Sequence, residues 1–206
     1  MKEKRIALFG GTFDPIHIGH TAVAASAVDY ISAEKVIFIP VRRSALKDFL
    51  PVAGDADRFK MTALAVSNND KFQLSDYELK KSGPGYTIET VRQFQREFGS
   101  ETSLHWLLGA DSIDDLPKWY KITELIDECN VSVMYRAGWE KPDFSKFTNI
   151  WGSKRVEKLQ RNVIETPLIN ISSTEIRYRL ASGKDVSDML CSDVVEYIHK
   201  HRLYHS

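Results

Sequence analysis

Short apolar runs recur along the chain, and longer stretches with helical spacing of apolar residues separate them. Most of the runs are nearly continuous rather than alternating, which is typical of strands that are covered on both faces of a parallel sheet. The predicted strands are residues 5–9, 35–40, 72–79, 104–109, 131–136 and 162–167. The predicted helices between them are residues 17–31, 55–67, 87–98 and 122–129. This alternation predicts an α/β fold with a doubly wound, open parallel sheet.

The second predicted helix and one later segment can be described further. Within residues 55–67, Phe59, Ala63 and Val66 share one face, so we expect this face to be buried. Residues 137–160 are the least regular part of the chain, and we predict a loop and a short helix there.

The last part of the chain has a different character. The sequence SSTE at residues 172–175 matches a capping box, in which Ser172 accepts from a first-turn amide and Glu175 reaches back to the helix start. We expect this helix to stop at Gly183 and a second one to begin at Ser192. The chain is therefore predicted to be one domain over residues 1–206, with residues 172–206 as a helical extension on the sheet.

Composition narrows the class of protein. The chain has 206 residues, of which 43% are hydrophobic and 27% charged, as is ordinary for a soluble globular protein. Its 28 basic residues balance 28 acidic ones, so no global field favours nucleic acid or a membrane as partner. No apolar run is as long as the roughly 18 residues of a membrane span, and no signal peptide is recognised. Cys129 and Cys191 lie outside any CxxC pattern, and we expect a reducing, cytoplasmic location.

The glycine-rich stretch that follows the first predicted strand is the first candidate site. Gly10 and Gly11 stand between a strand and a helix, where free backbone N–H groups and the helix dipole suit phosphate. A plain tight turn is the alternative, and these residues alone do not separate the two. The fingerprint GxGxxG is absent, which disfavours a dehydrogenase.

His17 and His20 follow this turn and are spaced to share one helix face. Metal ligation would need further ligands, and no acidic or cysteine partner stands nearby at the right spacing, so no metal site built from protein residues is predicted. Two histidines that face a glycine turn instead suit donation to phosphate oxygens, since they can be neutral in the free site and stabilise charge as it builds.

A second candidate stretch is INISSTEIR, residues 169–177. Ser172, Ser173 and Thr174 open a helix, and Arg177 lies one turn further on, where its fork can reach the same anion. An ordinary capping box with a solvated arginine is the alternative for this stretch taken alone.

The two stretches together carry a resemblance. GGTFDPIHIGH, residues 10–20, resembles the (H/T)xGH signature of the nucleotidyltransferase superfamily, and residues 169–177 resemble its ISSTxxR signature. The resemblance implies a Rossmann-like nucleotidyltransferase fold in which the two signatures face each other across the nucleotide. It also implies magnesium, held by the ATP phosphates and water.

The middle of the chain narrows the family. Residues 85–90 (GYTIET) and 107–120 (LLGADSIDDLPKWY) are similar to the bacterial nicotinate-nucleotide adenylyltransferases. The resemblance then implies transfer of AMP from ATP to nicotinate mononucleotide, giving deamido-NAD and pyrophosphate in NAD biosynthesis.

The resemblance also assigns residues to roles. It implies that the catalytic residues are His17, His20, Lys47 and Arg177. The implied ATP-binding residues are Gly10, Gly11, Thr12, Phe13, Asp111, Ile171, Ser172, Ser173 and Thr174. The implied mononucleotide-binding residues are Tyr86, Thr87, Gly109, Trp119 and Tyr120, with Trp119 stacked on the pyridine ring. The alternative for Trp119 is a core or hinge aromatic, and the alternative for Asp111 is a helix N-cap.

One stretch departs from the family. A Pro-Pro-His-Lys run usually follows the second strand, and here Ser44, Ala45 and Leu46 precede Lys47 instead. Only the lysine role transfers, to Lys47; Arg42 and Arg43 are either electrostatic replacements or solvated surface charges.

The sequence leaves several alternatives open. The acceptor could be nicotinamide mononucleotide or phosphopantetheine, and a nucleotide-binding sensor without activity is the non-enzymatic alternative. Asp14 offers a carboxylate beside the histidines, for which a turn cap is the other role. A homo-oligomer is also left open.

Overall fold

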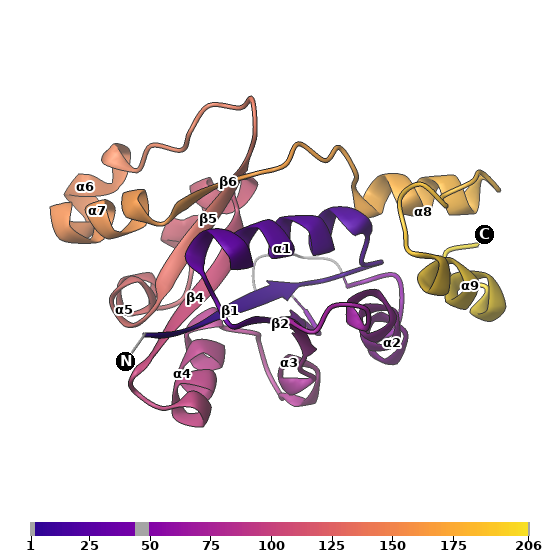
Figure 1. Ribbon diagram of the computed structural model, residues 1–206, viewed down its shortest axis with the longest axis horizontal. Helices are drawn as coiled ribbons and strands as arrows, with labels where there is room; N and C mark the ends of the chain where they lie inside the picture. The colour runs from indigo at the N-terminus through magenta and orange to yellow at the C-terminus, as the bar shows by residue number, and fades with distance from the viewer. Residues whose placement is uncertain (1–2, 44–49, 206) are drawn as a thin grey trace.

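A six-stranded parallel sheet forms the centre of the molecule. The computed structural model describes residues 3–43 and 50–205 (Figure 1). The strands are β1 (Lys4–Gly11), β2 (Lys35–Pro40), β3 (Phe72–Leu74), β4 (Thr102–Gly109), β5 (Asn130–Arg136) and β6 (Val163–Thr166). They are ordered β3-β2-β1-β4-β5-β6, and every neighbouring pair is parallel. The predicted doubly wound parallel sheet is confirmed.

Helices cover both faces of the sheet. The longer ones are α1 (Ile18–Ile31), α2 (Asp55–Val66), α4 (Thr87–Phe98), α5 (Ile122–Glu128), α7 (Ser153–Arg161), α8 (Ser173–Ala181) and α9 (Ser192–His201). The shorter ones are α3 (Tyr77–Lys80), α6 (Thr148–Trp151) and the 3-10 helices η1 (Ala110–Lys118) and η2 (Ser145–Phe147).

Two apolar cores follow from the alternation of side chains along each strand. Strand β1 sends Ile6 and Leu8 into a core with α4, α5 and α7. It sends Ala7 and Phe9 into a second core with α1, α2, α8 and α9. Both faces of the central strands are thus buried away from solvent, which explains their continuous apolar runs.

Two predictions for the second quarter of the chain were wrong. The strand predicted at 72–79 ends at Leu74 and gives way to helix α3, where the Tyr77 amide bonds the Ser75 hydroxyl. At the edge of the sheet, β3 pairs on one side only, so a short strand suffices. The buried face of α2 likewise matches the predicted one only at Val66.

Helix α2 buries Arg58, Met61, Thr62 and Val66, whereas Phe59 and Ala63 are only half-buried. The face is rotated because the Arg58 guanidinium finds carbonyl and carboxylate partners inside the protein. A buried cation that is paired and hydrogen-bonded can occupy a core position in place of an aromatic ring.

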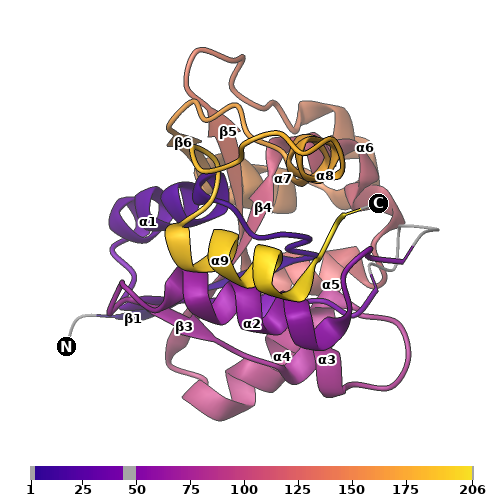
Figure 2. The same cartoon turned by 90° about the vertical axis from the view of Figure 1, so that its right-hand side faces the viewer.

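The C-terminal helices return to the first half of the chain. Helix α9 lies along α2, as both views show (Figures 1 and 2), and the Tyr197 hydroxyl donates to Asp57 at 2.9 Å. Helix α8 starts as predicted, with the Ser172 hydroxyl accepting from the Glu175 amide at 3.2 Å. The other half of the capping box was wrong, because the Glu175 carboxylate pairs with Arg179 instead.

Residues 137–160 contain more helix than predicted. After the loop that follows β5, the segment forms η2, α6 and the nine-residue helix α7. Trp151 is buried in the first core, and Trp139 is 64% exposed. Among the described residues, no helix is long and apolar enough to cross a membrane.

Candidate active site

The turn after β1 brings backbone close to aromatic rings. A Cβ atom on Gly10 would lie 2.5 Å from the Trp106 indole, and one on Gly11 would lie 2.7 Å from the Phe13 ring. Any other residue at either position would collide with a buried ring system, so both glycines are needed for close approach. Phe13 is itself buried at a φ of +48°, a conformation that a bulky residue rarely adopts.

The two histidines are stacked on each other beside this turn. Their ring centroids lie 3.7 Å apart at 29°, and the His20 ring meets the edge of Phe13 at 5.1 Å. His17 occupies the N-cap of α1, and its backbone N–H donates to Nδ1 of His20 at 3.2 Å. Nδ1 of His17 has no hydrogen-bond partner among the described residues. A polar atom buried without a partner is a feature of ligand sites.

Burial makes both imidazoles weak bases. It lowers the pKa of His17 to about 4. The pKa of His20 lies well below its ordinary value because of burial and, second, the nearby His17. Both rings are therefore neutral in the free protein near pH 7, as the sequence analysis expected of donors to phosphate.

The two signatures meet although they lie at opposite ends of the chain. The Ser173 hydroxyl donates to the Pro15 carbonyl oxygen at 2.9 Å. Nη1 of Arg177 donates to the Asp14 carbonyl oxygen at 2.7 Å, and its Nη2 donates to the Thr174 hydroxyl at 3.2 Å. Ile171 packs beside them against the second core. Helix α8 thus begins against the turn that carries the histidines.

Asp14 acts as a junction between three segments. Its carboxylate accepts from the amides of Val52 and Ala53, at 2.8 and 3.0 Å, and from the Tyr204 hydroxyl at 2.8 Å. The side chain is buried, and Arg177 lies 3.8 Å from it. These bonds fit the turn-capping role that the sequence analysis gave as one of two.

Arg58 is a residue to which the sequence analysis gave no role. Its side chain is 0% exposed, and Nη1 donates to the carbonyl oxygens of Thr12 at 2.6 Å and Val41 at 2.8 Å. The available signal was the spacing of Arg58, Met61 and Thr62, which places the arginine on one face with an apolar neighbour.

The structure places the predicted acceptor residues at the start of α4, at the end of β4 and after η1. Tyr86 is the N-cap of α4, which begins at Thr87, and its ring packs on Tyr120 with centroids 4.4 Å apart. Trp119 packs partly on the first core, and its buried Nε1 has no partner among the described residues.

The end of β4 leads directly into this region. Gly109 is both its last residue and the N-cap of η1, so Asp111 is not the N-cap that was the alternative for it. A Cβ atom on Gly109 would lie 2.4 Å from Oδ1 of Asp111, so the glycine lets the exposed carboxylate fold back over the strand end.

The cations of the segment after β2 were also considered in the sequence analysis. Lys47, with Ser44, Ala45 and Leu46, lies outside the described residues. Arg42 pairs with Asp55 at 3.0 Å on the surface. Within residues 3–43 and 50–205, no group of three or more His, Cys, Asp or Glu lies close enough together to hold a metal ion.

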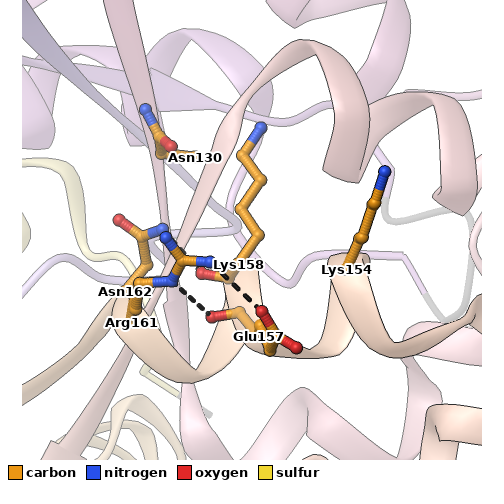
Figure 3. Close-up of a pocket in the computed structure, with 6 residues that line it drawn as sticks. All are labelled: Asn130, Lys154, Glu157, Lys158, Arg161 and Asn162. Atoms are coloured by element: carbon orange, nitrogen blue, oxygen red, sulfur yellow. Dashed lines mark hydrogen bonds and ion pairs between the residues drawn. The ribbon is translucent and has the colours of Figure 1, made fainter.

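A cavity of about 410 Å³ lies elsewhere, between α7 and the start of β5 (Figure 3). Two of its basic side chains already have partners: Nζ of Lys158 donates to the carbonyl oxygens of Ile126 and Asp127 at the end of α5, and Arg161 pairs with Glu157. The cavity contains none of the predicted site residues.

Comparisons with known proteins identify the family of the chain. The sequence profile of the cytidylyltransferase-like family matches residues 8–179. A protein of Clostridium tetani named probable nicotinate-nucleotide adenylyltransferase is 36% identical, over 98% of this chain and 99% of its own length. A protein of Neisseria meningitidis with the same name is 38% identical, over 98% of both chains.

Solved structures share the fold. The nicotinic acid mononucleotide adenylyltransferase of Plasmodium falciparum, solved with NaAD, has a TM-score of 0.72 at 20% identity, over 98% of this chain and 97% of that one. A putative nicotinate-nucleotide adenylyltransferase of Vibrio parahaemolyticus has a TM-score of 0.65 at 21% identity, over 98% and 96%. The predicted nucleotidyltransferase fold is confirmed, and by its sequence the chain belongs to the cytidylyltransferase-like family and, within it, to the nicotinate-nucleotide adenylyltransferases.

Proposed function

We propose that the protein transfers the adenylyl group of ATP to nicotinate mononucleotide, giving nicotinate adenine dinucleotide and pyrophosphate. One observation carries the proposal: the two signatures that define the family in sequence are bonded to each other in space, through Ser173 to Pro15 and Arg177 to Asp14. The similarity to the relatives named nicotinate-nucleotide adenylyltransferase extends over the whole chain and supports the choice of acceptor.

The reaction requires positioning and charge stabilisation rather than a general base. A phosphate oxygen of the mononucleotide attacks the α-phosphorus of ATP and forms a new P–O bond. The bond from the α-phosphorus to the bridging oxygen breaks, and pyrophosphate leaves with that electron pair. The attacking phosphate is already an anion near pH 7, so no proton has to be removed first. The main contribution of the protein is to hold both phosphates in line and to stabilise the charge.

The proposed donors have complementary properties. His17 and His20 are neutral in the free site because their pKa values are lowered, so they can donate hydrogen bonds without repelling neighbouring cations. Arg177 brings a permanent charge on a fork that the Asp14 carbonyl oxygen orients. We assign Lys47 the same phosphate role on the basis of the family resemblance.

The hydroxyl groups of α8 have partners within the protein. The Ser173 hydroxyl donates to Pro15, and the Thr174 hydroxyl accepts from Arg177. We therefore propose that Ser173 and Thr174 act on pyrophosphate mainly through the amides of the helix start, where the dipole is positive. Gly10, Gly11, Thr12 and Phe13 would supply backbone contacts to the nucleotide.

We propose Mg²⁺ as the cofactor, bound to the phosphates of ATP and to water. The Asp14 carboxylate, next to the histidine turn, already accepts two amides and a tyrosine hydroxyl, which fits an ion whose ligands come from substrate and solvent. When bound, the ion neutralises phosphate charge.

Pyrophosphate release tests the proposal directly. The protein is incubated with ATP and magnesium and with nicotinate mononucleotide, nicotinamide mononucleotide or phosphopantetheine, and the dinucleotide product is identified by mass. We expect the highest kcat/KM with nicotinate mononucleotide. A preference for either other acceptor would overturn the assignment of the acceptor, and no turnover with any of them would favour a nucleotide-binding sensor.

A further inference from the structure

We infer that Arg58 is a positioning residue of the phosphate site. Its buried guanidinium turns the peptide units after β1 and β2 so that the amide N–H groups of Phe13 and Arg42 face away from it, toward the ATP phosphates. That the ligand is ATP rests on the proposed function. The contacts of Arg58 are observed independently of it.

The guanidinium joins two loops that follow neighbouring strands. Nη1 donates to the carbonyl oxygens of Thr12, just after β1, and of Val41, just after β2. The Val41 amide in turn donates to the Gly11 carbonyl oxygen at 2.9 Å. Arg58 comes from α2 and its side chain is 0% exposed, so it contacts both loops from the interior of the protein.

These contacts, together with peptide geometry, fix the directions in which two amide N–H groups point. In a planar trans peptide unit, the C=O and N–H groups point in opposite directions. Asp14–Pro15 is the only cis peptide bond in the described part of the chain, so the Thr12–Phe13 and Val41–Arg42 units are trans. With both carbonyl oxygens turned onto Arg58, the amides of Phe13 and Arg42 must point away from it. Neither amide has a hydrogen-bond partner among the residues that the structure describes.

The charge of Arg58 strengthens the same two donors. A charge-assisted bond to a carbonyl oxygen polarises the whole peptide unit and makes its N–H more positive. Asp55 accepts from Nη2 at 2.6 Å, but it also pairs with Arg42, so one carboxylate serves two guanidinium groups. Nε of Arg58 is buried without a partner. The positive charge of the Arg58 guanidinium is therefore only partly neutralised beside the two peptide units.

The conformation of Phe13 is consistent with this arrangement. The residue sits at a φ of +48°, which has to be maintained by its surroundings. The guanidinium holds the carbonyl group immediately before it, at Thr12. A merely structural arginine would anchor α2 and have no consequence for phosphate, whereas a positioning role predicts a selective loss of affinity for phosphates.

Equilibrium binding of ATP and of adenosine, measured by calorimetry with magnesium, separates the two roles. Arg58→Lys keeps the charge but removes the planar guanidinium, in which Nη1 bonds both carbonyl oxygens while Nη2 bonds Asp55. We expect the Kd for ATP to rise about tenfold or more, as for a lost bond to a charged group, with the Kd for adenosine and the KM for the acceptor within about twofold. Arg155→Lys is the matched control, because Arg155 also bonds a carboxylate and a carbonyl oxygen, at Asp127 and Trp151.

Asp55→Asn provides a second variant if Arg58→Lys does not fold, which circular dichroism reports. It loosens the guanidinium from its carboxylate, and we expect weaker binding of ATP with unchanged binding of adenosine. An unchanged ATP affinity, or an equal loss for ATP and adenosine, would overturn the inference. If the wild-type protein binds ATP but turns over no acceptor, the proposed reaction fails while the Arg58 test remains valid.

Discussion

Nη1 of Arg177 donates to the carbonyl oxygen of Asp14 at 2.7 Å, across a separation of 163 residues. The acceptor lies in the turn between β1 and the histidines, and the donor lies in the second turn of α8. The backbone near the N-terminus therefore orients a cation that lies near the C-terminus. A guanidinium can do this and still present further N–H groups to a ligand, which a lysine ammonium does less well.

Arg177→Lys is expected to lower kcat by about a hundredfold, because the ammonium cannot bridge the Asp14 carbonyl oxygen and the Thr174 hydroxyl while also contacting phosphate. Steady-state pyrophosphate release measures the effect. Arg179→Lys, on the same helix but paired with Glu175 and Asp188, is the control and should keep wild-type activity. Equal losses in the two variants would contradict a specific role for Arg177.

His20→Ala is expected to reduce kcat by two to three orders of magnitude, about the effect of removing one donor from a preorganised charge-stabilising site. The fold should survive, because the His20 side chain is only half-buried, at the margin of the second core against the rings of His17 and Phe13. Circular dichroism and a melting curve check the fold. His199→Ala removes an exposed histidine of α9 and should leave the rate unchanged. Retained activity in His20→Ala would remove the phosphate role from this residue.

The elements that were predicted correctly are those with strong local signals. Strands β1, β2, β4, β5 and β6 each contribute buried apolar residues to both cores, so their apolar runs are visible in the sequence alone. Strand β3 is different: none of its three residues is fully buried, and Phe72 and Leu74 pack only against the second core. The length of β3 depends on which backbone groups of β2 can pair with it, and an apolar run in the sequence does not indicate this.

Site residues that lie in short sequence motifs could be predicted. Residues whose position depends on backbone groups far away in the sequence could not. The histidine pair and the start of α8 could be found from spacing. The burial of Arg58 could not, because it depends on carbonyl oxygens of Thr12 and Val41 that only the fold brings together. The bond from Tyr204 to Asp14 likewise joins residues that have no relation in sequence.

Stability is expected to fall as the pH drops from about 6.5 to about 4, because His17 and His105 are buried in the neutral form. Burial lowers the pKa of His17 to about 4, and burial together with Arg5 lowers the pKa of His105 to about 4. The unfolded chain takes up protons on these rings below about pH 6.5, whereas the folded protein does not until about pH 4. Each of the two then loses on the order of 3 kcal/mol of unfolding free energy across this window.

Urea unfolding at pH 7.5 and at pH 5 measures this dependence. His105 lies far from the proposed chemistry, bonded to the Ser132 hydroxyl at 2.9 Å between β4 and β5. His105→Gln should therefore be less sensitive to pH than the wild-type protein, with activity preserved. His199→Gln, at an exposed position, should show the wild-type dependence. A His105→Gln variant with undiminished sensitivity would show that the buried ring is not responsible.

Trp119 is expected to decide how well the acceptor binds. Trp119→Ala should raise the KM for nicotinate mononucleotide by about tenfold or more, since stacking of a base on an aromatic ring contributes about 1–3 kcal/mol. The KM for ATP should stay within about twofold, because none of the proposed contacts to ATP involves Trp119. Trp119→Phe keeps a ring and should lose less.

Two controls separate stacking from packing. Trp119 also packs partly on the first core, so each variant is assayed well below its own melting temperature. Trp139→Ala removes a tryptophan that is 64% exposed and lies over Arg136, and it should change neither KM. If Trp119→Ala raised both KM values equally, the tryptophan would act on the structure of the site as a whole. The choice of acceptor would then have to depend on the Tyr86 and Tyr120 rings and the start of α4.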